Sequence, residues 1–130
     1  MLVYGDHARE VRPSEVLAAI RGRLRRAEAV PAGIARHMAL VALLIEAGEL
    51  AQGLLDADFA ERRQDEPGQR GAACLALPMA LARAVRDSYM SGFMRYSPVP
   101  DEVLDALERL ELPERATVNE GDVFRAISRT

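Results

Sequence analysis

The chain has 130 residues, enough for one domain with one hydrophobic core, and we treat residues 1–130 as that domain. Its residues are 49% apolar and 28% charged, a globular composition that excludes an intrinsically disordered chain. The net charge of −3 disfavours binding to nucleic acid, and the single cysteine excludes an internal disulfide.

The first predicted helix begins near Pro13 and ends before Pro31, because proline suits a first helical turn and disfavours helical geometry in the residue before it. Its apolar stripe consists of Val16, Leu17, Ile20, Leu24 and Ala27. We interpret the basic run at residues 21–26 as a solvated face. The second interpretation is a contact with an acidic partner, such as this chain's own acidic C-terminal helix in a dimer, and the third is nucleic acid.

A second predicted helix spans about residues 32–59 and is the most apolar segment. At 100° per residue, its broad apolar arc consists of Leu40, Leu43, Leu44, Ala47, Leu50, Ala51, Leu54 and Leu55. The acids Glu46, Glu49 and Asp56 fall on one narrow strip, shared with Met38 and Gly53. A helix that is apolar over most of its girth is typically central, so this strip faces either water or a polar cleft.

The rest of the chain is also predicted to be helical, with breaks at proline and glycine. Residues 61–71 are expected to form a polar loop. Residues 70–93 form a third helix, which either kinks at Pro78 or is divided there into two. A fourth helix spans about residues 101–112 and opens with acids, which the helix dipole favours.

Strand signals are almost absent, and only residues 2–4 are expected to be extended. A last short helix is expected from Asn119 onward, because asparagine is a suitable helix cap. The predicted fold is therefore all-α: a small helical bundle of four main helices plus a short C-terminal helix.

One short stretch, residues 46–50, carries a family resemblance. Glu46 and Glu49 within Glu-Ala-Gly-Glu-Leu resemble the first motif, E-x-x-E, of the all-α nucleoside-triphosphate pyrophosphohydrolases, the MazG-like family. The resemblance implies that Glu46 and Glu49 bind Mg²⁺ and that a nucleotide is cleaved to a monophosphate and pyrophosphate. The family's second motif, E-x-x-D, has no counterpart, since no acid occurs between Gly68 and Arg86. The alternative is that both glutamates lie on a solvated face.

Other catalytic or metal-binding patterns are not found. His7, His37 and Cys74 have no recognised zinc spacing, and no Walker A, Rossmann or nucleophile-elbow pattern occurs. We interpret His37 as a hydrogen-bonded residue at the edge of the core and Cys74 as a small core residue. The sequence therefore indicates no catalytic residue.

Residues 89–98 contain an unusual concentration of aromatic and methionine side chains in a chain with six aromatics. This candidate ligand or partner patch comprises Tyr89, Met90, Phe93, Met94, Tyr96 and, from the second helix, His37. The cluster could fill the core at a helix end, line a pocket, or anchor a partner, because aromatics and methionine are enriched at interface centres.

Our leading functional hypothesis is a non-catalytic protein-interaction domain that forms homo-oligomers, with itself or another protein as partner and no cofactor. The alternatives are a Mg²⁺-dependent nucleotide pyrophosphohydrolase and a small-ligand-binding helical module with a pocket near Tyr89, Phe93 and His37. We expect no signal peptide in the first ten residues and no membrane span, because no apolar run approaches ~20 residues. A single cysteine fits a reducing compartment, so we expect a cytoplasmic protein.

Overall fold

The computed structural model describes residues 8–61 and 69–120, and the side chains of 8–57 and 71–120. The described chain is mostly helical. Its elements in chain order are β1 (Ala8–Val11), α1 (Pro13–Ala29), α2 (Ile34–Glu61), α3 (Gln69–Met90), α4 (Asp101–Glu108) and β2 (Ala116–Asn119). The predicted helical character is thus confirmed, with four helices in the described ranges.

The described chain also contains a small antiparallel sheet of β1 and β2, which the sequence did not predict. Ala8 pairs with Asn119 and Val11 pairs with Ala116. Asn119 is therefore the last residue of β2. The strand expected at residues 2–4 and the rest of the expected C-terminal helix lie outside the described residues.

The helix ends follow the local chemistry of the chain. Pro13 is the first residue of α1, and the helix ends before Pro31 as predicted. Pro78 lies inside α3, which continues through it as one helix. After Met90 the chain turns through Gly92 and Phe93, which have positive φ angles of 65° and 69°. This left-handed turn ends α3 three residues before the predicted position.

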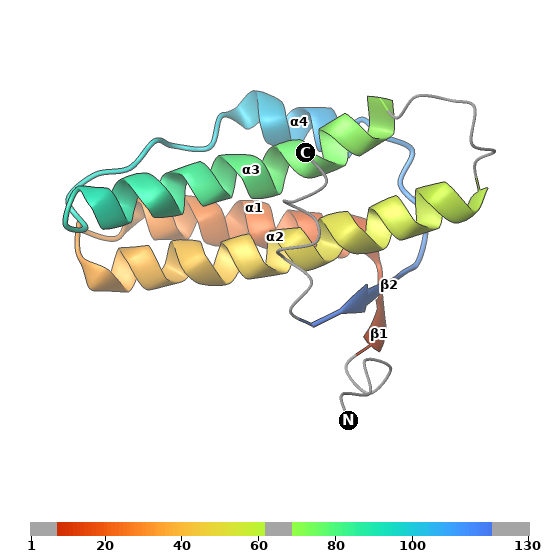
Figure 1. The fold of residues 1–130 in the computed structure, drawn as a ribbon, viewed down its shortest axis with the longest axis horizontal. Helices are drawn as coiled ribbons and strands as arrows, with labels where there is room; N and C mark the ends of the chain where they lie inside the picture. The colour runs from red at the N-terminus through yellow and green to blue at the C-terminus, as the bar shows by residue number, and fades with distance from the viewer. Residues whose placement is uncertain (1–7, 62–68, 121–130) are drawn as a thin grey trace.

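α2 lies between the other helices and the small sheet (Figure 1). It runs antiparallel to α3 beside it, α1 passes behind it, and β2 packs against its C-terminal half. The buried residues of α2 include Leu40, Leu43, Ala47, Leu50, Ala51 and Leu54. These belong to the predicted apolar arc, so the prediction that this arc faces the core is confirmed for them.

At Gly53 the sheet lies so close to α2 that a side chain would not fit without a shift. A Cβ atom at this position would lie 2.7 Å from the carbonyl oxygen of Thr117 and 3.0 Å from a methyl group of Val118. Every other residue type would therefore push β2 away from the helix. In β2 itself, Ala116 and Val118 are buried and Thr117 is exposed, which is the alternation of a strand lying on a helix.

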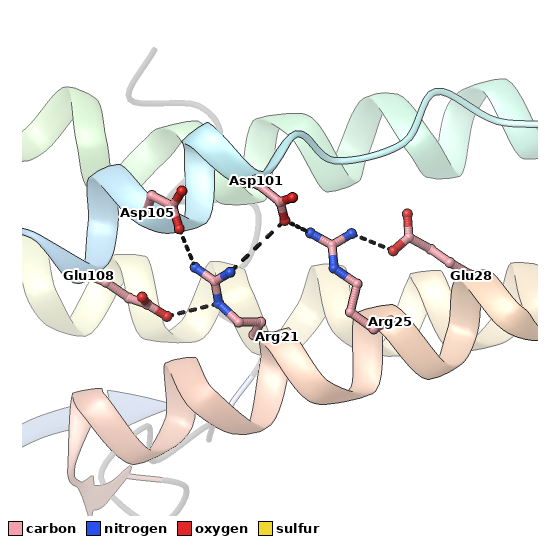
Figure 2. Close-up of polar contacts among 6 residues, drawn as sticks. All are labelled: Arg21, Arg25, Glu28, Asp101, Asp105 and Glu108. Atoms are coloured by element: carbon pink, nitrogen blue, oxygen red, sulfur yellow. Dashed lines mark hydrogen bonds and ion pairs between the residues drawn. The ribbon is translucent and has the colours of Figure 1, made fainter.

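Ion pairs connect α1 to α4 on another side of the molecule (Figure 2). The Arg21 guanidinium donates from Nη2 to Asp105 over 2.8 Å and from Nε to Glu108 over 2.9 Å. Arg25 donates to Glu28 on its own helix and to Asp101 of α4. The hydrogen bond with Asp105 is the main cause that raises the pKa of Arg21. Part of the basic run thus contacts the acidic helix of the same chain.

We expect Gly53→Ala to lower the free energy of unfolding by about 1 kcal/mol, although alanine is the better helix former. The reason is the collision of the new methyl group with the Thr117 carbonyl. Gly22→Ala is the matched control, because its Cβ would meet only the flexible end of Arg26 at 3.6 Å. The control should gain stability in urea unfolding, and an equal gain for Gly53→Ala would contradict the observed packing of β2.

We expect Arg21→Met to lower the free energy of unfolding by about 1 kcal/mol at low ionic strength and by less in high salt. The side chain is 29% exposed and its two main carboxylate partners are 44% and 46% exposed, so solvent screens these pairs. Arg109→Met, at an exposed position directly after α4, is the control. Urea titrations at two salt concentrations provide the measurement, and equal salt dependence of both variants would exclude the contribution of these ion pairs.

Candidate functional site

The two glutamates of the predicted acidic strip have different surroundings. Glu46 accepts a hydrogen bond from Arg23 of α1, which holds its carboxylate in an ion pair between the helices. Glu49 is only 7% exposed. It lies in a small hollow with Arg9 and Val118, beneath the β1–β2 sheet. The strip therefore faces the sheet along the C-terminal half of α2.

Both glutamates of the predicted Mg²⁺ site have neighbours within the chain. The carboxylate of Glu46 already has a cationic partner, and Glu49 is buried. Within residues 8–61 and 69–120, no three His, Cys, Asp or Glu side chains form a group that could hold a metal ion. The nucleotide pyrophosphohydrolase hypothesis thus stays a prediction with no additional ligand from the described chain.

The aromatic cluster around His37 divides into an inner and an outer part. His37 is buried, and its Nδ1 lies 2.9 Å from the hydroxyl oxygen of Ser88. The ring of Phe93 lies 4.9 Å from the His37 ring, between centroids. The Arg36 guanidinium lies 4.8 Å above the ring of Tyr96, and burial is the main cause that raises the pKa of this tyrosine. His37, Phe93 and Tyr96 therefore pack inward.

The outer part of the cluster is open to solvent. Tyr89, Met90 and Met94 are 68%, 77% and 69% exposed. Each lies at the end of α3 or directly after it. The predicted patch therefore contains three outward-facing anchors supported by a packed layer beneath them.

These three residues are part of a larger set of exposed apolar side chains. The described side chains include seven large hydrophobic residues that are exposed: Ile34, Met38, Ile45, Met79, Tyr89, Met90 and Met94. All of them lie on α2, on α3 or in the segment that follows α3. We call this set the apolar face. The large hydrophobic residues of α1 and α4 are, in contrast, buried or half-buried.

The part of the apolar face on α2 was not recognised in the sequence. Ile34, Met38 and Ile45 fall on the outer stripe that continues into Glu49 and Gln52. The sheet covers this stripe at Glu49 and leaves its apolar half open. Met38 could have indicated this part of the face, because it is an apolar residue on the predicted strip of Glu46, Glu49 and Asp56.

Two hollows open beside α2 and α3. One has a volume of about 260 Å³ and lies between α1 and α2, lined by Arg23, Arg26, Ala27, Val30, Ala39, Ala42 and Leu43. The other, about 380 Å³, lies at the end of α3, lined by Asp87, Met90, Ser91, Arg95, Tyr96 and Ser97. In the second hollow the hydrogen bond from Ser97 is the main cause that lowers the pKa of Asp87. The small-ligand hypothesis placed its pocket near Tyr89, Phe93 and His37, none of which lines this hollow, so that hypothesis stays a prediction.

The length of α2 has a further implication. Its 24 residues Ile34–Ala57 are long and apolar enough to cross a membrane by length and composition alone. Core helices of soluble proteins meet the same criterion, and 56% of the stretch considered is buried within this fold. The absence of a membrane partner therefore stays a prediction.

Comparison with known proteins assigns no relative. No protein-family model, no curated protein and no solved structure matches the chain. Functional inference therefore depends on the contacts, burial and charge of the described residues.

Proposed function

We propose that this chain is a non-catalytic helical domain that functions by associating with a second copy of itself through the apolar face. The observation that carries this proposal is the concentration of exposed large hydrophobic residues on α2 and α3. Scattered exposed hydrophobic residues are normal on a soluble protein, whereas contiguous apolar surfaces mark interaction sites.

The size of the apolar face supports an interface. The exposed fractions of its seven side chains range from 41% to 77%. With roughly 200 Å² for the full surface of one large side chain, they amount to on the order of 800 Å² per copy. A typical stable interface buries about that area on each partner.

Its composition supports the same proposal. Four of the seven side chains are methionines, which adapt to an opposing surface, and one is a tyrosine. The exposed charges between them on α3 are Arg83 and Arg86. Arginine is more frequent at interfaces than lysine or the acids. We infer no catalytic step from this surface.

We expect the wild-type chain to sediment as a concentration-dependent dimer and Met38→Glu to weaken the dimer by about tenfold or more, because a buried unpaired charge is unfavourable. Met38 is 56% exposed, so its replacement should leave the fold intact.

Ala18→Glu is the control, since it adds the same charge at an exposed position of α1, outside the apolar face. Sedimentation equilibrium of the three proteins gives the dissociation constants, and circular dichroism checks their folding. A wild-type chain that is strictly monomeric at the highest concentration refutes self-association.

A further inference from the structure

The outer stripe of α2 has the spacing of a helix-pairing seam. Ala35, Met38, Ala42 and Ile45 are separated by three, four and three residues. All four are exposed. Spacing of this kind keeps side chains on one seam when two helices pack along their length. The seam ends at Glu49, where the β1–β2 sheet covers the helix.

We infer that the second copy, which the proposed function requires, pairs its α2 antiparallel to the first, about a two-fold axis level with Leu40. A residue that lies a given number of positions before Leu40 in one copy then faces the residue that lies the same number of positions after Leu40 in the second copy. Met38 lies opposite Ala42 of the second copy, and Ile45 lies opposite its Ala35. The symmetry repeats both contacts, as a two-fold interface requires.

Each contact combines a large side chain with a small one. Large residues opposite small residues allow helices to interlock without voids or collisions. A parallel, in-register pairing would instead set Met38 against Met38 and leave alanines facing alanines. The order of large and small residues along the seam therefore selects the antiparallel arrangement.

The hollow between α1 and α2 provides the receiving site for Met38. Its volume is about 260 Å³, and it includes Ala42 in its wall beside Ala39 and Leu43. In the antiparallel arrangement, Met38 of the second copy lies over Ala42 and thus over this hollow. An unbranched methionine side chain suits an irregular apolar hollow of this kind.

Disulfide cross-linking tests the arrangement. Cys74 is first replaced by alanine, and Met38→Cys and Ala42→Cys are made as separate proteins in this background. We expect an oxidised mixture of the two to form a cross-linked heterodimer, whereas either protein alone forms much less. A disulfide requires Cα atoms within about 7 Å, which only opposing positions on the seam satisfy.

Stronger cross-linking of each protein with itself than of the mixture would establish a parallel pairing and overturn the inference. A mixture that does not cross-link, although the wild-type chain sediments as a dimer, would also overturn it and would leave self-association intact. A monomeric wild-type chain, in contrast, refutes the proposed function itself. The two failures are therefore distinguishable.

Exchange of the large and small residues gives a second test. We expect Ala42→Met alone to weaken the dimer by about tenfold, because methionine then meets methionine. Adding Met38→Ala should restore the affinity of the wild-type chain, since each large side chain again faces a small one. Both positions are exposed, so the variants should fold. A double variant as weak as the single one contradicts the antiparallel contacts.

Discussion

The fold depends on the covering of one helix that is apolar around most of its circumference. α3 and α1 cover two sides of α2, and β2 covers part of a third. The third contact requires a residue without a side chain at Gly53, because the Thr117 carbonyl occupies the space of a Cβ atom. What these neighbours leave uncovered is the N-terminal half of the outer stripe, and this remainder forms the α2 part of the apolar face.

Charged and apolar surfaces are separated between the two sides of the molecule. On the side of α1 and α4, arginines and carboxylates satisfy one another within the chain, as Arg21 does with Asp105 and Glu108. On the side of α2 and α3, large apolar residues face solvent. Charges that are already paired within the chain gain little free energy from a partner. Burial of the exposed apolar side chains, in contrast, would be favourable. This division explains why the proposed contact lies on α2 and α3.

The sequence predicted the parts of the fold that depend on local pattern. α1 has apolar residues on a single face, so its buried positions follow from helical spacing. α2 is apolar on nearly every side, and spacing alone could not show that Met38 would be open while Gln52 would be 1% exposed. That outcome depends on contacts with residues distant in the chain, which the spacing along one helix does not show.

The sheet and the candidate site escaped prediction for related reasons. The two strands have four residues each, and their partners are distant in the chain, so local pattern hardly marks them. The partners of Glu46 and Arg21 likewise lie on other helices. The aromatic cluster was recognised by composition, but the separation of buried His37 from exposed Met90 required the turn after α3.

The distance between the two strands along the chain also has a consequence for the order of events during folding. Arg115 and Glu10, which pair beside the sheet, are separated by 105 positions. Contacts between such distant residues carry a large loop-closure entropy and form late. While a ribosome is still producing the chain, the sheet cannot close before residues 116–119 emerge. Until then the outer stripe of α2 is open at Glu49 as well, and this carboxylate becomes buried only when the sheet closes.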